Sequence, residues 1–163
     1  MARDPEAPPA RLYLVTPLLG AAEPFDAALK AALGAGDVAC VLVRFAASDP
    51  GRRKAIVRAL ATIVQSADAA LIVDGDAQLA ARAGADGVHV EGLGEAFGDA
   101  LESCKPDRIV GVGGLATRDD CMSAGEDDVD YLIFGAPDDS ASPAEILERT
   151  RWWAEIFNVP CVA

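Results

Sequence analysis

The stretch from residue 71 to residue 90, LIVDGDAQLAARAGADGVHV, most constrains how this chain can fold. An apolar run at 71–73 ends at Asp74-Gly75-Asp76, a helical segment follows at 77–82, and a second apolar run occupies 88–90. The two runs are predicted strands. They must be parallel, because the helix between them returns the chain to the edge of the sheet where the first strand began.

The same alternation of apolar strands and amphipathic helices recurs along the whole chain. Capping signals mark several helix starts, such as Asp49-Pro50 and Ser142-Pro143 with Glu145. Pro17 is expected to close the first strand, because proline cannot donate to a ladder. The predicted strands are 12–16, 39–44, 71–73, 88–90, 108–112, 130–134 and 159–163; the predicted helices are 24–33, 50–65, 77–82, 95–103, 118–122 and 143–156.

This pattern predicts an α/β fold with a wholly parallel sheet. No G-x-G-x-x-G follows the first strand, which disfavours a dinucleotide-binding sheet. The spacing of the elements alone does not decide between an open doubly wound sheet and a TIM-type (β/α)₈ barrel. Such a barrel needs eight strands and usually about 250 residues. On the barrel alternative, which the family resemblance described below favours, we expect an incomplete barrel of about seven parallel strands and six helices. It forms a single domain over 11–163 that follows a flexible lead-in at 1–10.

Composition excludes several classes of function. A formal net charge of −12 argues against nucleic acid and anionic membranes as partners. The apolar runs are far shorter than the roughly 18 residues of a membrane span, and the N-terminus lacks a signal-peptide core, so we expect a cytoplasmic protein. The four cysteines form no C-x-x-C pair and are expected to be free thiols.

The succession of strand ends resembles the thiamine-phosphate synthases. The resemblance is carried by RLYLVTP at 11–17, VLVR at 41–44, the 71–90 stretch, RIVGVGG at 108–114 and DYLIFG at 130–135. It implies a (β/α)₈ enzyme that joins hydroxymethylpyrimidine diphosphate to thiazole phosphate, giving thiamine phosphate and pyrophosphate. It also implies small phosphorylated substrates, Mg²⁺ as cofactor, and working residues at the carboxyl ends of the strands.

Carried over by position, the resemblance makes Arg44, Asp74, His89, Gly113 and Gly135 substrate-binding candidates. Arg44 is the residue kept from a family Gln-Leu-Arg-x-Lys motif and could clamp a phosphate; it could equally pair with an acidic neighbour. His89 could act as a base or be structural. Gly113 stands where the family has a serine, and Gly135 precedes the family's pyrophosphate loop. No residue is assigned as catalytic.

The resemblance also implies a Mg²⁺ site at Asp74 and Asp76. Glycine stands between them where the family has its aspartate ligand, and the family's second carboxylate falls at Gly94, with Glu91 and Glu95 close by. Two carboxylates flanking a glycine can hold a hard cation. Alternatively, Asp76 caps the following helix and Asp74 shapes the turn.

Many motif positions are replaced, so we do not expect full synthase activity. The family's Thr- and Lys-containing loop reads Ala-Pro-Asp-Asp-Ser at 136–140, and the chain ends before the loops that normally hold thiazole phosphate. The alternative is a catalytically inactive barrel that serves as a small-molecule-binding or interaction module. A thiazole tautomerase is a third option, which the lack of a histidine after the fifth strand disfavours.

An incomplete barrel leaves apolar strand edges exposed. Either a homodimer covers them, or the chain is a fragment of a longer protein. Trp152 and Trp153 on the last helix could cover such a gap, although one of them is expected to be core.

Overall fold

The computed structural model describes residues 9–46, 49–135 and 140–163. In these residues, strands and helices alternate strictly, as predicted. The strands are β1 (Leu12–Leu19), β2 (Val38–Phe45), β3 (Ala70–Asp74), β4 (Gly87–Glu91), β5 (Ile109–Gly113), β6 (Tyr131–Ile133) and β7 (Cys161–Val162). The helices are α1 (Asp26–Ala35), α2 (Pro50–Ser66), α3 (Ala77–Ala83), α4 (Glu95–Cys104), α5 (Arg118–Glu126) and α6 (Pro143–Ile156). Most of the predicted lead-in, residues 1–8, lies outside the described residues.

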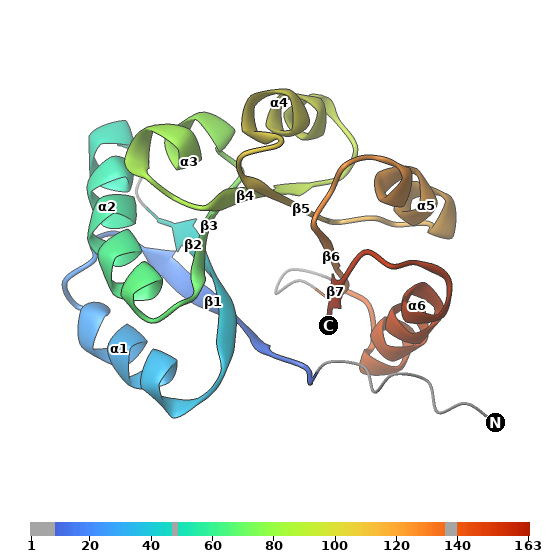
Figure 1. Ribbon diagram of the computed structural model, residues 1–163, viewed down its shortest axis with the longest axis horizontal. Coiled ribbons are helices and arrows are strands. Elements are labelled where there is room, and N and C mark those ends of the chain that lie inside the picture. Colours follow the sequence, from blue (N-terminus) through green and yellow to red (C-terminus); the bar gives the residue numbers. More distant parts are fainter. Residues whose placement is uncertain (1–8, 47–48, 136–139) are drawn as a thin grey trace.

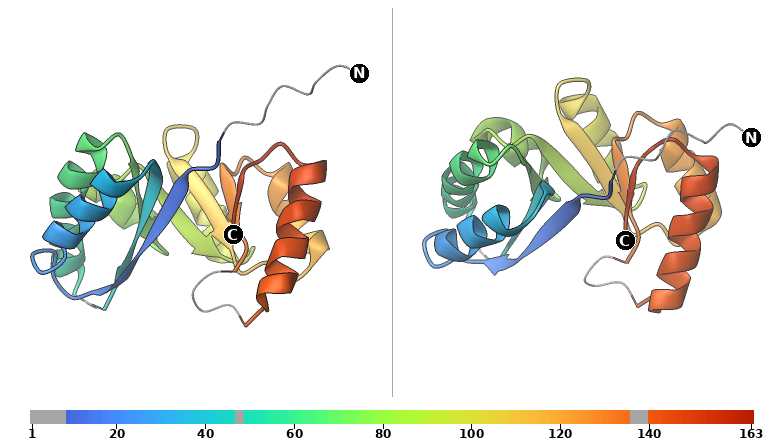
Figure 2. Two further views of the ribbon diagram at one scale, coloured as in Figure 1. Left: turned by 90° about the horizontal axis from the view of Figure 1, so that it is seen from below. Right: turned by 60° about the horizontal axis from the view of Figure 1, so that its bottom comes forward.

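The strands form one parallel sheet in the order in which they occur along the chain, β1 to β7. The sheet curves into an arc with the helices on its outer side (Figure 1, Figure 2). Within the described residues the arc does not close, because β1 and β7 each pair with one strand. The prediction of an incomplete TIM-type barrel of seven strands and six helices is confirmed.

The main core lies between the sheet and its helices. Alternate strand residues such as Val41, Val43, Val88 and Val90 point outward and pack with the helices in one cluster, and α2 contributes Leu60 among others. Fully burying an aliphatic side chain of this size contributes about 1.5–3 kcal/mol. The strand residues that alternate with them face the inside of the arc. This set includes Leu42, Ile72, His89, Tyr131 and Ile133.

The prediction that Pro17 closes the first strand is wrong. β1 continues to Leu19, and its pairing with β2 shifts register between Val15 and Leu18. The shift places the proline where no ladder donor is required. The Thr16 hydroxyl takes over the bond, because its oxygen accepts the Arg44 backbone N–H at 3.0 Å.

Capping side chains set the helix starts as the sequence predicts. The Asp49 carboxylate accepts the Arg52 N–H, and Ser142 forms a capping box with Glu145. The Ser142 hydroxyl and backbone bonds lower the pKa of Glu145. α5 runs on to Glu126, four residues further than predicted, and its start is fixed by a second capping box at Thr117. No helix of the described part has the length and apolar character that spanning a bilayer requires.

The four cysteines carry free thiols, as predicted. Cys104 and Cys121 are buried, whereas Cys40 and Cys161 are half-buried. Burial raises the pKa of the Cys40, Cys121 and Cys161 thiols, which keeps them protonated and weakly nucleophilic.

Candidate active site

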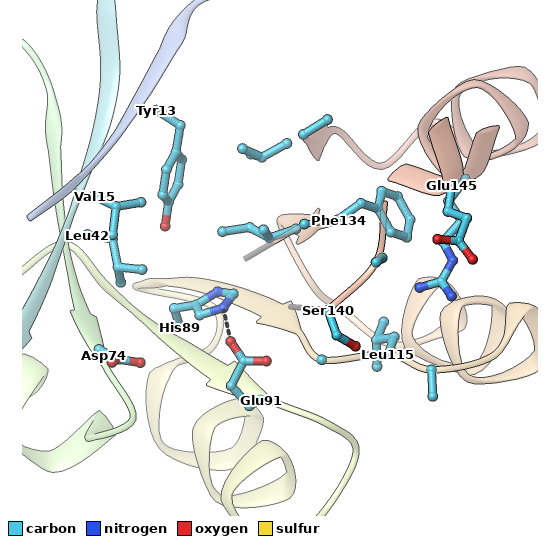
Figure 3. Close-up of a pocket in the computed structure, with 18 of the residues that line it drawn as sticks. Tyr13, Val15, Leu42, Asp74, His89, Glu91, Leu115, Phe134, Ser140 and Glu145 are labelled. Atoms are coloured by element: carbon cyan, nitrogen blue, oxygen red, sulfur yellow. Dashed lines mark hydrogen bonds and ion pairs between the residues drawn. The ribbon is translucent and has the colours of Figure 1, made fainter. Parts of the chain in front are cut away.

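A cavity of about 760 Å³ opens at the carboxyl ends of the strands, inside the arc of the sheet. Its wall is built by strand ends, by the loops after β5 and β6, and by the first turns of α6 (Figure 3). The carboxyl end is where barrel enzymes place their sites. The lining residues are Tyr13, Val15, Leu42, Arg44, Asp74, His89, Glu91, Gly114, Leu115, Ala116, Ile133, Phe134, Gly135, Ser140, Ala141, Glu145, Arg149, Val162 and Ala163.

Four of the five predicted substrate-binding residues line this cavity: Arg44, Asp74, His89 and Gly135. Arg44 and Asp74 lie at the ends of β2 and β3, His89 lies within β4, and Gly135 follows β6, and the parallel sheet brings them together. Gly113 is the last residue of β5 and lies just behind the wall, next to the lining residue Gly114. The replaced loop at 136–139 lies outside the described residues.

Asp76, the second predicted metal ligand, does not line the cavity. Its Oδ1 accepts the Leu79 backbone N–H at 2.8 Å and caps α3, and it borders a separate hollow between α3 and α4. The capping alternative for Asp76 is therefore confirmed. Whether either aspartate binds a metal stays a prediction.

The chemistry of the donor set limits how Mg²⁺ could be held. The described residues contain no group of three or more histidine, cysteine or acidic side chains placed to hold a metal. Asp74 does present a carboxylate to the cavity. One carboxylate fits Mg²⁺ that is held mostly by water and substrate phosphates, which is how Mg²⁺ is commonly bound.

Four polar side chains form a hydrogen-bonded series across the inside of the arc, from Tyr13 on β1 through Tyr131 on β6 to His89 and Glu91 on β4. The Tyr13 and Tyr131 hydroxyls lie 2.7 Å apart, and Tyr131 Oη lies 3.3 Å from His89 Nδ1. His89 Nε2 lies 3.2 Å from Glu91 Oε1 (Figure 3). His89 is 1% exposed and stacks on the Tyr131 ring, whereas the Glu91 side chain is 53% exposed.

Elementary hydrogen-bond rules assign the donor and the acceptor at each step of this series of side chains. Burial raises the pKa of both tyrosines, so their hydroxyls stay protonated. An ionised carboxylate only accepts, so His89 Nε2 carries the hydrogen that points to Glu91. In the tautomer with its hydrogen on Nε2, Nδ1 accepts from the Tyr131 hydroxyl. Tyr13 then donates to the Tyr131 oxygen. These hydrogen bonds hold the His89 imidazole and the Glu91 carboxylate in one fixed arrangement.

Two glycines make room for the Glu91 carboxylate. A Cβ atom at Gly113 would lie 3.0 Å from His89 Nε2 and 3.1 Å from Glu91 Oε1, and one at Gly114 would collide with Glu91 Oε2. Gly114 also has φ +63°, a conformation that favours glycine. The place that the resemblance gives to a serine side chain is thus occupied here by the His89–Glu91 pair.

The cavity carries charges of both signs. Arg44 on β2 and Arg149 on α6 supply guanidinium groups, while Asp74, Glu91 and Glu145 supply carboxylates. The remaining wall is largely apolar. A ligand with an anionic part and a flat, apolar or hydrogen-bonding part would match this surface.

Sequence reasoning did not single out Tyr13, Tyr131 or Arg149, and it considered Glu91 only as a substitute metal ligand. A signal for Tyr131 is present in Gly111. A Cβ at Gly111 would overlap the Tyr131 ring, so a glycine in one strand accompanies a large ring in the next. Arg149 has no comparable signal, because its position depends on how α6 lies against the barrel.

A curved parallel sheet covered by helices, with a cavity at the carboxyl ends of its strands, defines a TIM-type (β/α) barrel protein. The sequence profile of the family described as thiamine monophosphate synthase matches residues 12–163. The chain belongs to this family.

Two relatives agree with this assignment, and a solved structure shares the fold. The thiamine-phosphate synthase of Rhodospirillum centenum is 41% identical over 161 residues, covering 94% of this chain and 76% of that protein. The thiamine-phosphate synthase of Erythrobacter litoralis is 35% identical over 167 residues, with coverage of 95% and 76%. The structure of thiamine phosphate pyrophosphorylase from Pyrococcus furiosus superposes with a TM-score of 0.74 at 22% identity, covering 93% of this chain and 72% of that one. This likeness supports the fold.

Proposed function

We propose that this chain binds the phosphorylated substrates of the thiamine-phosphate synthases and joins them with low efficiency. In that reaction the bond between the pyrimidine methylene carbon and the diphosphate oxygen breaks. The methylene carbon then bonds to the thiazole nitrogen, and pyrophosphate leaves with the bonding electron pair. The observation that carries the proposal is the presence of Arg44 and Asp74 in one cavity, at the ends of adjacent strands.

In this proposal Arg44 binds the diphosphate through its planar guanidinium group, which suits two phosphate oxygens. Asp74 is the side chain that would contact Mg²⁺, which neutralises the leaving group when bound. Gly135 lines the cavity with φ +76°, and a Cβ there would press on the Ile146 side chain, so this position offers a ligand backbone atoms alone. Arg149 is a second cation for a phosphate on the α6 side.

The low efficiency follows from the replacement of polar motif residues of the family by apolar residues and glycines. Leu42 stands in place of a family glutamine, and glycines stand at 75, 94 and 113 in place of polar residues. By analogy with single oxyanion donors, each lost contact costs about 2–4 kcal/mol of transition-state stabilisation. The net charge of −12 also opposes a diphosphate at long range.

Ligand-dependent melting tests the proposal. With Mg²⁺, hydroxymethylpyrimidine diphosphate at 100 times its Kd should stabilise the protein by about 2.7 kcal/mol. We expect a clear rise in Tm that disappears without Mg²⁺ and in Arg44→Ala. Arg82→Ala removes an exposed arginine at the end of α3, outside the cavity, and should keep the full shift. A cooperative melt with the same Tm in the presence of Mg²⁺ and hydroxymethylpyrimidine diphosphate would contradict binding and favour the second candidate.

The second candidate is a catalytically inactive barrel that acts as a small-molecule-binding or interaction module. The edge strand β1 favours it, since Leu12 and Leu18 are 52% and 58% exposed. In this case a homodimer would cover the open edge. For either candidate, we propose the cytoplasm as the location of the protein.

Sedimentation at increasing protein concentration tests the dimer. We expect the mass to rise from monomer to dimer, and Leu18→Lys to shift the equilibrium toward monomer, because it places a charge on the edge strand. Leu147→Lys changes a similarly exposed leucine on α6 and should leave the equilibrium unchanged. A monomer at every concentration would rule out self-association.

A further inference from the structure

We propose that Glu91 determines which ligand ring the cavity accepts, by taking hydrogen bonds from an amino group on a nitrogen heterocycle. The inference rests on the proposed function and names the residue that distinguishes the pyrimidine half of the substrate. It follows from the way Glu91 is held, from the space that surrounds it, and from the separation of charge in the cavity.

Glu91 is held firmly on one side and open on the other. Its Oε1 accepts from His89 Nε2 at 3.2 Å, and His89 is itself fixed by the Tyr131 hydroxyl at 3.3 Å. With 53% of its side chain exposed, Glu91 still faces the cavity (Figure 3). A carboxylate has about four acceptor positions, so the bond to His89 leaves acceptors for a ligand. A preorganised acceptor loses little freedom on binding.

The glycines at 113 and 114 show that this arrangement depends on a specific space. A side chain at position 113 would press on both His89 Nε2 and Glu91 Oε1. The polar group available at this point of the wall is therefore the carboxylate. A carboxylate accepts hydrogen bonds but cannot donate, so it favours ligand N–H groups over ligand carbonyl or ring-nitrogen acceptors.

The charges orient the ligand. The Glu91 carboxylate repels phosphate oxygens, whereas Arg44 and Arg149 attract them, so the phosphate end of the ligand is placed on the side of these arginines. The part of the ligand beside Glu91 is then its uncharged or cationic ring. Leu42, which also lines the cavity, offers that ring an apolar surface. An aminopyrimidine satisfies both conditions, because it is flat and carries an N–H donor at its rim.

The test is a calorimetric titration with two probes that carry no phosphate. One is the amino-bearing hydroxymethylpyrimidine alcohol, and the other is the same alcohol without the amino group. We expect wild type to bind the amino probe at least about tenfold more tightly, as a hydrogen bond to a charged group provides. In Glu91→Gln the preference should fall to less than about twofold. Glu95→Gln removes the same charge from an exposed position in α4 and should keep the preference.

Gly113→Ala provides an independent variant that retains the carboxylate. Its Cβ would displace the His89–Glu91 pair, so this variant should also lose the preference for the amino probe while it keeps a cooperative melt. Equal affinity of wild type for the two probes, no binding of the amino probe, or a preference that survives in Glu91→Gln would each overturn the inference. Because neither probe contains phosphate, failure of diphosphate binding or of turnover leaves this result independent.

Discussion

Replacing Trp153 by alanine is expected to lower the free energy of unfolding by about 3–5 kcal/mol, the usual range for a large buried aromatic residue. Trp153 is fully buried, and its ring stacks on Phe157 with centroids 3.9 Å apart. The indole N–H donates to the Val159 carbonyl at 2.7 Å, which ties α6 to the segment that leads into β7. The substitution leaves a cavity and removes the bond to the Val159 carbonyl, and urea unfolding monitored by circular dichroism measures its cost.

The neighbouring Trp152 provides the control. It is half-buried and lies against the Arg118 guanidinium, 4.9 Å from the ring centroid. Trp152→Ala should cost at most about 2 kcal/mol, because solvent already reaches part of the ring. The expectation that one of the two tryptophans belongs to the core is confirmed for Trp153. Equal losses of unfolding free energy in Trp153→Ala and Trp152→Ala would contradict the expectation that the fully buried ring contributes more than the half-buried one.

The second large effect is expected at Gly111. A Cβ there would overlap the Tyr131 ring, and Tyr131 is buried and bonded to both Tyr13 and His89. Gly111→Ala should therefore destabilise the protein by about 2–3 kcal/mol, at the upper end of the usual cost of overpacking. It should also change the near-ultraviolet circular dichroism, since the Tyr13–Tyr131–His89 contacts must move.

Gly98→Ala makes the same chemical change in α4, where a Cβ would meet no atom within 4 Å. This variant should gain about 0.5–1 kcal/mol, because alanine favours a helix over glycine. The two substitutions are therefore expected to have opposite signs in the same urea experiment. A neutral Gly111→Ala would mean that Tyr131 does not occupy the position described.

Most of the fold could be predicted because it is encoded locally. The 71–90 stretch became β3, α3 and β4, with bounds that differ by one residue from those predicted. The capping residues Asp49 and Ser142 fixed helix starts through contacts three residues away. Pro17 misled the prediction because its effect depends on the neighbouring strand, where a register shift and the Thr16 hydroxyl accommodate it.

The site could be predicted only in part, because several of its contacts depend on how distant segments of the chain pack together. Arg44, Asp74 and His89 meet because the strands are parallel and their ends converge, which the sequence order already implies. Tyr131 required knowledge of which strand residues point inward. Arg149 required the orientation of α6. The contacts of these residues join segments far apart in the chain, and no local pattern encodes them.

The sequential order of the sheet has a consequence for how the chain folds. Paired residues are between 15 residues apart, as for Ile72 and Gly87, and 30 residues apart, as for Cys40 and Ala70. Within the described residues no sheet pairing joins the first strand to the last. Each step therefore closes only a short loop, and the entropy lost per step stays small. Folding can advance from one strand–helix unit to the next, so nascent structure can form in the same direction as synthesis.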